Sequence, residues 1–399
     1  MVRGRMYALL WAVLTLAAVG SAEFQVHQYT QHDQMHPAVA MNEVGDFVVA
    51  WRSNPCDGRG GGVYARCFHA DGTPITGEFR ANDSVADVDN WGPAVAISAS
   101  GKVVVVWIGV QEGQRAVVAR MFDLQGTPLT DEFLVNTSSE AVAQSTPSIG
   151  MNAAGAFVIV WTNHCGMGLR ARCFAAGRVY HEDGSPVGDE FPVAESAQAR
   201  WPDVAMEDSG FIVTWIRLGD TYNQPYGEYI QLRRFEADGT PAGNAVCITG
   251  DLYNRWYGPS IAVGAAGQFA VTWAVGPFPH DICMQTFDSQ GSPITESYVI
   301  SDCLEENQGR PCIATNGKGE YLAIWESQGQ DGDCYGVFGQ CCTGEGELHG
   351  GPLALNTCVA GRQWYPDVAM SPDGDYVVVW ISQDQDGSGY GIFAETSAR

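Results

Sequence analysis

Basic residues are scarce in this chain, and long apolar runs are missing beyond its first residues. Lysine and arginine number 21 against 46 aspartates and glutamates, which gives a formal net charge of -25. A field of this sign repels nucleic acid and anionic membrane surfaces, so both are excluded as partners. No later segment approaches the about 18 uninterrupted apolar residues that a membrane-spanning helix needs. We therefore expect a mature chain without membrane insertion.

The familiar motifs of catalysis are also missing. The chain has no Gly-x-Ser-x-Gly, no His-Glu-x-x-His and no glycine loop of the kind that cradles phosphate. The sequence therefore identifies no catalytic residue and favours a protein that is not an enzyme. Carboxylates gathered around the centre of the fold would be the exception, as in some glycosidases. The positions of the acidic residues Asp203, Glu228 and Asp367 are left open by the sequence.

The first residues have the pattern of a secretory signal peptide. Arg3 and Arg5 precede an apolar run from residue 7 to residue 19, and the small residues Gly20-Ser21-Ala22 follow it. We expect cleavage after Ala22, which would bring the formal net charge to -27 through the loss of both arginines. The mature chain is then predicted to be secreted or periplasmic.

One phrase recurs seven times, a proline followed by a glycine turn and a strand that ends in tryptophan. The copies run from Pro37 to Trp51, Pro93 to Trp107, Pro147 to Trp161, Pro202 to Trp215, Pro259 to Trp273, Pro311 to Trp325 and Pro366 to Trp380. The interval is 14 residues in six copies and 13 in the fourth, and successive tryptophans are 52 to 58 residues apart. This period fits one four-stranded propeller blade with its loops.

Four short strands can be assigned within the first copy. They are residues 37 to 41, with the proline at the strand start, 47 to 51, 63 to 68, and a strand around Glu78-Phe79. The turn before the fourth strand carries Gly-Thr-Pro or Gly-Ser-Pro, at residues 72 to 74 here and again in four later copies.

The seventh copy stops after its third strand. Residues 23 to 26, with Phe24 standing 13 residues before Pro37, have the spacing of the missing fourth strand. The prediction is an all-β, single-domain, seven-bladed β-propeller over residues 23 to 399, closed by the N-terminal strand, which also removes the exposed sheet edge.

The chain resembles the repeat propellers of secreted bacterial proteins. The residues that carry the resemblance are Val377-Val378-Val379-Trp380 followed by Gln385-Asp386-Gly387-Ser388-Gly389, with a partial second loop at Gln330-Asp331-Gly332. The resemblance covers the whole mature chain and implies the fold. It implies no particular activity, because a fold does not determine a function.

Twelve cysteines in a secreted chain indicate disulfides. Copy-to-copy matching pairs Cys56 with Cys67, Cys165 with Cys173, and Cys334 with Cys341 or its neighbour Cys342, while Cys303 and Cys312 flank the start of the sixth copy. Cys247, Cys283 and Cys358 have no assigned partner. Zinc is the alternative, but no Cys-x-x-Cys pair supports it.

In a blade of this order, two sets of connections emerge on the same face of the ring, which we call the loop face. They join the second strand to the third, and the fourth strand to the next blade. The candidate ligand-binding residues fall in the latter set, just before the prolines, and are Trp91, Arg200, Trp201, Arg255, Trp256, Tyr257, Gln363, Trp364 and Tyr365. Aromatic rings beside such donors can stack on sugars or clamp a peptide. The alternative is that the rings fill the wedge between neighbouring blades.

Acidic loops on the same face suggest a weak calcium site. Asp384 and Asp386 alternate near glycine in the last copy, as do Asp331 and Asp333 in the sixth. The closing glutamate of a calcium loop is missing, so a plain tight turn competes with this interpretation. His32 and His36 lack an accompanying set of metal ligands.

The sequence thus predicts a secreted module that binds an extracellular carbohydrate, or secondly a protein, through the loop face. A hydrolase or lyase of extracellular polysaccharide in the same place and a structural surface protein remain as alternatives. The oligomeric state is open.

Overall fold

The computed structural model describes residues 23–54, 62–83, 92–111, 113–137, 143–165, 172–194, 198–207, 209–218, 228–252, 257–264, 266–301 and 306–397. These residues form seven antiparallel sheets of four strands each, as predicted. Among them, no helix is long and apolar enough to cross a membrane.

The sheets are numbered here as blades in chain order. Blade 1 is β2 (Gln34–Met41), β3 (Phe47–Ser53), β4 (Gly62–Phe68) and β5 (Phe79–Arg80); blade 2 is β6 (Ala94–Ile97), β7 (Val103–Gln111), β8 (Gln114–Phe122) and β9 (Phe133–Leu134); blade 3 is β10 (Ala143–Met151), β11 (Phe157–Cys165), β12 (Arg172–Tyr180) and β13 (Phe191–Pro192); blade 4 is β14 (Ala199–Met206), β15 (Gly210–Leu218), β16 (Glu228–Glu236) and β17 (Val246–Leu252). Blade 5 is β18 (Ser260–Val263), β19 (Phe269–Val275), β20 (Asp281–Phe287) and β21 (Tyr298–Val299); blade 6 is β22 (Gln308–Thr315), β23 (Glu320–Gln328), β24 (Tyr335–Thr343) and β25 (Leu348–Ala354); blade 7 is β26 (Gln363–Met370), β27 (Tyr376–Gln383), β28 (Tyr390–Thr396) and β1 (Phe24–Gln25).

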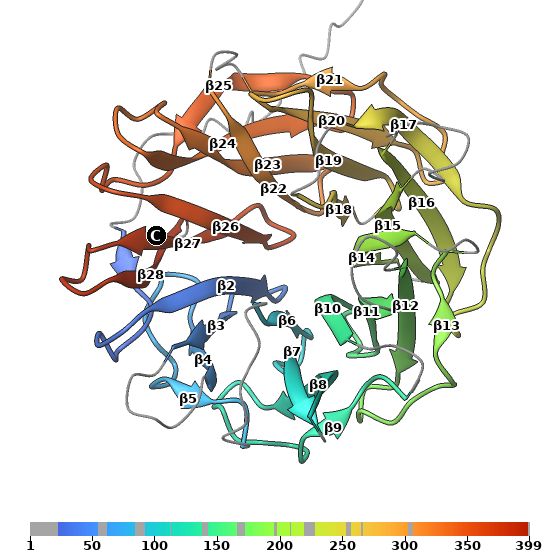
Figure 1. Ribbon diagram of the computed structural model, residues 1–399, viewed down its shortest axis with the longest axis horizontal. Helices are drawn as coiled ribbons and strands as arrows, with labels where there is room; N and C mark the ends of the chain where they lie inside the picture. The colour runs from blue at the N-terminus through green and yellow to red at the C-terminus, as the bar shows by residue number, and fades with distance from the viewer. Residues whose placement is uncertain are drawn as a thin grey trace, which may run out of the picture.

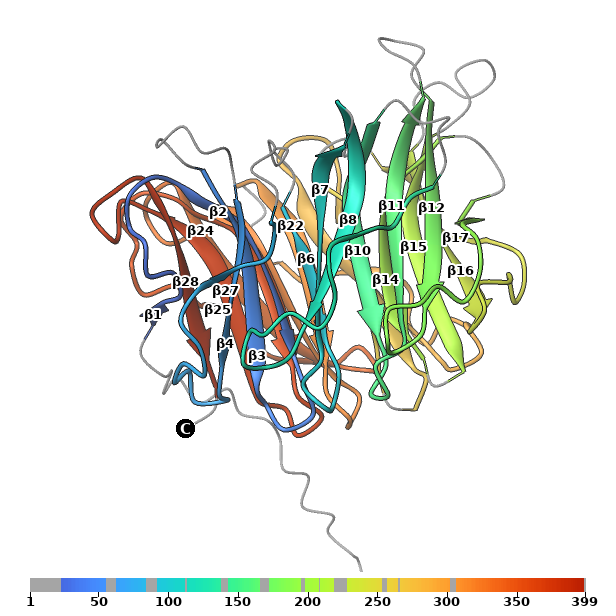
Figure 2. The same ribbon diagram turned by 90° about the horizontal axis from the view of Figure 1, so that it is seen from below.

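The blades stand around a central axis like the sectors of a disc. Figure 1 looks down this axis and shows the first strand of every blade innermost and the fourth at the rim. Figure 2 shows the same disc from its edge, with the strands running from one face to the other. This arrangement is that of a seven-bladed β-propeller.

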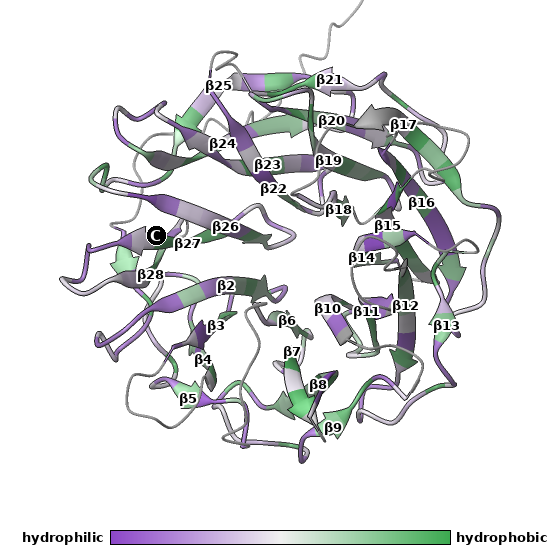
Figure 3. Ribbon diagram, viewed as in Figure 1, coloured by the Kyte–Doolittle hydropathy of each residue, from purple (hydrophilic) through white to green (hydrophobic). Residues whose placement is uncertain are grey.

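The second strand of each blade supplies most of the core. In blade 1, every residue of β3 is buried, because the β-branched and aromatic sequence Phe-Val-Val-Ala-Trp packs against a neighbouring blade on each face. Figure 3 shows apolar residues along these middle strands, hydrophilic residues in many of the turns, and both kinds along the rim. The seven repeated tryptophans are at most 2% exposed, so each is a spacer of the core and not a contact for ligands.

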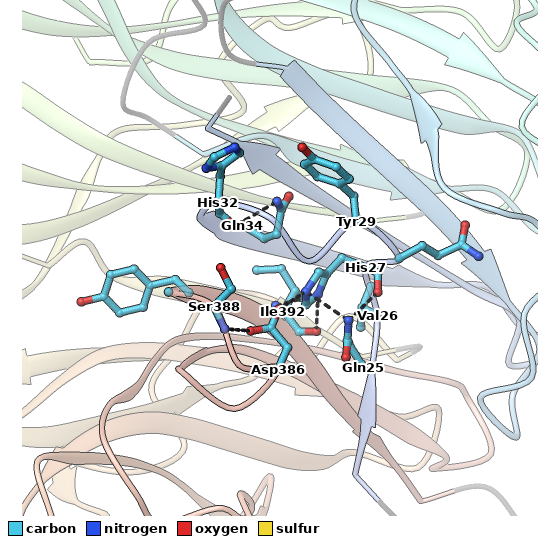
Figure 4. A network of polar contacts seen from close by, with 12 residues as sticks. Gln25, Val26, His27, Tyr29, His32, Gln34, Asp386, Ser388 and Ile392 are labelled. Carbon is cyan, nitrogen blue, oxygen red and sulfur yellow. Dashed lines mark hydrogen bonds and ion pairs between the residues drawn. The ribbon is translucent and has the colours of Figure 1, made fainter. Parts of the chain in front are cut away.

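Closure of the ring involves strands from the two ends of the chain. β1 pairs antiparallel with β28, with Phe24 opposite Ala394 and Gln25 opposite Phe393. Just beyond β1, the buried His27 accepts a hydrogen bond at Nδ1 from the Ile392 amide (3.1 Å) and donates from Nε2 to the Asp386 carboxylate (2.8 Å). Figure 4 shows this network between the N-terminal segment and the last blade.

The sequence suggested that each repeated proline begins the first strand of its blade, and this prediction is wrong for five blades. In five blades the strand starts before the proline, and the register shifts at that point. In blade 1, Met35 pairs with Arg52 and Ala38 with Ala50, so His36 and Pro37 together stand opposite the single residue Trp51. This is a β-bulge, a position where a proline is tolerated because it has no amide hydrogen to donate to the ladder. Only β6 and β18 begin after their prolines.

The matching of cysteines between copies was wrong in register. Phe47 pairs with Phe68 in blade 1, and the equivalent Phe157 pairs with Tyr180 in blade 3, so Tyr180 and not Phe174 corresponds to Phe68. Cys67 therefore lies near the end of its strand with a buried free thiol, and its predicted partner Cys56 is outside the described residues.

Cys173 occupies a different place, at the loop-face end of β12. It pairs in register with His164, and its sulfur lies 3.3 Å from His164 Nδ1, whereas Cys165 pairs with Arg172.

The predicted link from Cys334 to Cys341 is also wrong. Cys334 precedes β24, and Cys341 lies near the end of the same extended strand. Because an extended strand rises about 3.3 Å per residue, the two cysteines are farther apart than a disulfide can span. Cys334, Cys341 and Cys342 carry free thiols. Cys312 is free as well, and Cys303 lies outside the described residues.

Candidate functional site

Each blade places one residue around the loop-face end of the central axis, and in the five blades with a β-bulge this residue is part of the bulge. These residues directly precede the repeated prolines and are His36, Gly92, Thr146, Trp201, Gly258, Arg310 and Tyr365. We call this set the mouth ring. The first strands are innermost in Figure 1, and each begins at the loop face, which fixes the location of the ring.

The five residues of the mouth ring that carry a side chain have a left-handed backbone. Their φ angles lie between 49° and 54°. For a residue other than glycine this conformation costs about 1–2 kcal/mol, and strain of this kind concentrates at functional sites. Glycine would avoid the cost, yet histidine, threonine, tryptophan, arginine and tyrosine stand there.

The two glycines of the mouth ring make room for their neighbours. A Cβ on Gly92 would lie 2.6 Å from that of His36, and one on Gly258 would lie 2.9 Å from that of Trp201. Each glycine thus allows the preceding blade to project a large side chain at the mouth.

Arg310 lies between the rings of two tyrosines. Its guanidinium carbon is 3.4 Å from the ring centre of Tyr365 in blade 7 and 5.3 Å from that of Tyr257, which precedes blade 5. Tyr257 packs so closely on Gly309 that a Cβ there would lie 2.5 Å from the tyrosine ring. Three consecutive blades therefore hold this arginine in place.

A buried carboxylate lies beneath Arg310. Glu326, whose side chain is 3% exposed, accepts a hydrogen bond from the Tyr365 amide (3.2 Å), and its Oε2 is 3.5 Å from Arg310 Nε. Burial raises the pKa of Glu326, while Arg310, the Tyr365 amide and the Tyr257 hydroxyl act in the opposite direction. Glu326 thus orients the bulge of the next blade and the inner side of the guanidinium.

His36 extends the cluster to blade 1. Its ring meets Tyr365 edge-on at 4.4 Å. Burial, and then the charges of Arg310 and Arg52, lower the pKa of His36 to about 4. His36 is therefore neutral at neutral pH and offers a hydrogen-bonding ring in a locally positive environment.

Trp201 forms the opposite part of the mouth ring. Its amide donates to Thr162 Oγ1 (3.1 Å), as the Tyr365 amide does to Glu326. Arg200 stacks 4.4 Å from the centre of the Trp201 ring and bonds the Glu228 carboxylate at 2.7 Å. Both Arg200 and Trp201 are partly exposed, so these two predicted residues lie together.

Asp203 and Asp367 directly follow the prolines of blades 4 and 7 on the innermost strands. Asp203 accepts hydrogen bonds from Ser148 Oγ (2.7 Å) and the Ile261 amide (3.0 Å), and Asp367 accepts one from the Val39 amide (2.8 Å). Both carboxylates thus tie neighbouring blades together. Burial raises both pKa values, that of Asp367 to about 7, and the charge of Asp203 adds to the shift of Asp367.

Gln363 and Trp364, two of the predicted ligand-binding residues, have structural partners within the protein. Gln363 is fully buried and donates to the Ala360 carbonyl. Trp364 is partly buried and packs against Tyr365, Tyr390 and the core cluster between blades 7 and 1, so the spacer interpretation fits this ring, and Tyr365 packs against the same cluster. Trp91, Arg255 and Trp256 lie outside the described residues.

The acidic loops use their carboxylates internally. Asp386 binds His27 and the Ser388 amide, and Asp384 binds the Gly389 amide. Asp331 accepts from Asn356 Nδ2 (3.3 Å), and Asp333 from the Gly361 amide. Within the described part of the chain, no three metal-ligating side chains come together. The tight-turn interpretation accounts for these contacts.

Sequence reasoning missed a serine-histidine pair. Ser145 Oγ lies 2.6 Å from His164 Nε2, on the side of the ring opposite to Cys173. Burial, with the charges of Arg115 and Arg200, lowers the pKa of His164. Because Ser145 is 3% exposed, the pair is a buried cross-strand contact and not an accessible nucleophile.

Sequence reasoning also missed the parts of the mouth played by His36, Arg310 and Glu326. A signal was present, since His36 and Arg310 hold the same place before the proline as Trp201 and Tyr365, which were selected.

Comparison with known proteins finds likeness at the level of structure only. No protein-family model and no curated protein matches the sequence. A protein of unknown function from Dyadobacter fermentans superposes with a TM-score of 0.55 at 9% identity, covering 94% of this chain and 97% of that one. The polysaccharide lyase Uly1 gives 0.55 at 11% identity, with 93% and 92% covered. An α-L-arabinanase from Penicillium chrysogenum, complexed with arabinobiose, gives 0.53 at 10%, with 82% and 100% covered. At these identities the likeness shows a shared β-propeller fold.

Proposed function

We propose that this protein is a secreted or periplasmic module that binds an extracellular glycan at the mouth ring. The observation that carries the proposal is the left-handed backbone of five mouth residues that are not glycine. A strained position filled by histidine, tryptophan, arginine and tyrosine is best explained by a use for those side chains. Aromatic faces beside amide, imidazole and guanidinium donors suit a sugar, which has apolar faces and directional hydroxyls.

The fold comparisons support a carbohydrate ligand without choosing one. The arabinanase complex has a disaccharide bound, and Uly1 is a polysaccharide lyase. Both share the fold of this chain and differ from it in about nine residues of ten. They therefore indicate which class of ligand to test first, and they assign no role to any residue of this chain.

Glu326 supports a second candidate, a polysaccharide hydrolase or lyase in the same mouth. A carboxyl group whose pKa is raised by burial, next to the tyrosine Tyr257, is a candidate proton donor. If that activity exists, product release from a bound polysaccharide depends on Glu326, and Glu326→Gln abolishes it while binding persists.

The test is a glycan array probed with the mature chain and with variants that remove one mouth side chain. Trp201→Gly and Tyr365→Gly suit this purpose because glycine adopts their backbone conformation without strain. Val44→Gly, at an exposed turn on the other face, is the control. We expect a specific hit that both variants lose and the control keeps. Silence on the array, or a hit that no mouth variant changes, would refute the proposal.

A further inference from the structure

The basic residues of this chain mostly have structural partners. Arg66, Arg120 and Arg178 each donate from Nε to a backbone carbonyl of the following turn and from Nη1 to a carbonyl at the end of the preceding blade. These contacts recur from blade to blade and join neighbours. A third-strand arginine therefore holds the ring together.

Arg310 departs from this pattern. Its nearest acceptor among the described residues is Glu326, 3.5 Å from Nε, which is longer than an ordinary hydrogen bond. Its side chain remains 32% exposed. The guanidinium is held by ring contacts and by the bulge, and the terminal amino groups form no hydrogen bond with the described residues.

Arg310 and Arg52 place positive charge at the mouth although the whole chain is strongly negative. The charges of Arg310 and Arg52 add to burial in lowering the pKa of His36, so both cations act on this part of the mouth. The compensating carboxylate, Glu326, is buried beneath the guanidinium and is 3% exposed. An approaching ligand thus meets the cation first.

A planar guanidinium fixed in this way is suited to one class of group. It presents two parallel donors that match the two oxygens of a carboxylate, and its orientation is set before binding by the Tyr257 and Tyr365 rings, so little rotamer entropy remains to be lost. A neutral sugar hydroxyl would use one such donor and leave the charge unused.

We propose that Arg310 is an anion subsite and that the glycan bound at the mouth contains uronic acid, whose carboxylate pairs with the guanidinium. This inference rests on the proposed function and narrows it to acidic saccharides. Neighbouring sugar rings would then contact the rest of the mouth ring.

The experiment uses three oligosaccharide probes of equal length, namely oligogalacturonate, its methyl ester and a neutral galacto-oligosaccharide. Binding is measured by calorimetry at about 0.15 M salt, where a screening length of about 8 Å weakens repulsion from the distant acidic surface. We expect the acid to bind at least about 10-fold more tightly than its ester, since a hydrogen bond to a charged group contributes about 1.5–3 kcal/mol.

Arg310→Gln should remove this preference, and Arg310→Lys should retain part of it through the charge. Arg362→Gln is the matched control, because Arg362 is an exposed arginine of the same face that stacks 5.4 Å from Trp364. Thermal unfolding of each variant verifies that the fold is intact. Arg310→Lys also keeps the test decisive if Arg310→Gln does not fold.

The outcomes separate the two proposals. Equal affinity for acid and ester, or a preference that Arg310→Gln and Arg310→Lys leave unchanged, would overturn the acidic subsite while leaving glycan binding in place. If a sulfated oligosaccharide without uronic acid bound better than the galacturonate, the carboxylate assignment would be wrong. Failure of every saccharide to bind would refute the proposed function itself.

Discussion

Asp367 should make the stability of the ring depend on pH in a predictable direction. Its carboxyl lies on the innermost strand of blade 7, and burial raises its pKa from 3.8 to about 7. A shift of about three pKa units corresponds to about 4 kcal/mol between the two protonation states. The charged form therefore destabilises the fold by up to about that amount.

The sign follows from proton binding. Between about pH 4 and pH 7 the folded state holds a proton on Asp367 that the unfolded chain has already released. The free energy of unfolding thus decreases as the pH rises through this window, and the full penalty is present above pH 7. Below about pH 4 both states are protonated and the penalty is absent.

Asp367→Asn removes this titration and keeps the shape of the side chain. Its amide oxygen can still accept from the Val39 amide, but its nitrogen cannot replace the contact with the Val368 amide, so a constant loss independent of pH is expected. The assay is the unfolding midpoint of both proteins from pH 4 to pH 8.5. Relative to the native protein, the unfolding midpoint of the variant should increase as the pH rises. Parallel pH profiles would refute the argument.

Three further predictions concern other sites. Glu395→Gln should also gain stability relative to the native protein between about pH 4.5 and 7, because burial and the charge of Glu23 raise the Glu395 pKa to about 7; equal midpoints at all pH values would contradict this. His27→Ala should lower the free energy of unfolding by about 3 kcal/mol in denaturant titrations, since it removes the imidazole donor of the buried Asp386 Oδ2 and leaves that carboxylate only the Ser388 amide. His27→Asn should be tolerated, because Asn356 makes both equivalent bonds in blade 6, and similar losses in the two variants would exclude this account. Cys334 should react with iodoacetamide in the native state and Cys341 only after unfolding, and a peptide linking them in a non-reducing digest would disprove the register.

The interval from proline to tryptophan was enough to predict the seven blades. Each interval spans one strand pair, and a ring of seven pairs follows from its repetition. The bulge could not be predicted in the same way. Its left-handed residues include Thr146 and Arg310, and neither threonine nor arginine is a residue type that favours a left-handed backbone. In each of the five blades that have the bulge, the register shift leaves two residues opposite one tryptophan, as His36 and Pro37 stand opposite Trp51 in blade 1.

A short identical sequence led to the wrong match between blades 1 and 3, and the spacing to the next turn would have given the right one. Residues 65–68 and 171–174 share the sequence Ala-Arg-Cys-Phe, yet Cys67 and Cys173 lie at opposite ends of their third strands. The distance to the following turn gives the correct match, since Phe68 precedes Pro74 and Tyr180 precedes Pro186 by the same six residues. The aromatic candidates failed for a related reason. Adjacent residues such as Trp364 and Tyr365 are both partly buried but have different partners, Tyr390 for the first and Arg310 for the second, and the sequence does not determine which of them reaches the mouth.

The pairing of β1 with β28 also determines how a ring of this kind can change its size. Among the strands that the structure describes, blade 7 is the one sheet that joins distant parts of the chain, where residues separated by most of the sequence meet. Every other blade is built from one continuous segment. A duplication or deletion of one such segment would leave this joint intact, so the number of sectors can evolve while the fastening stays the same.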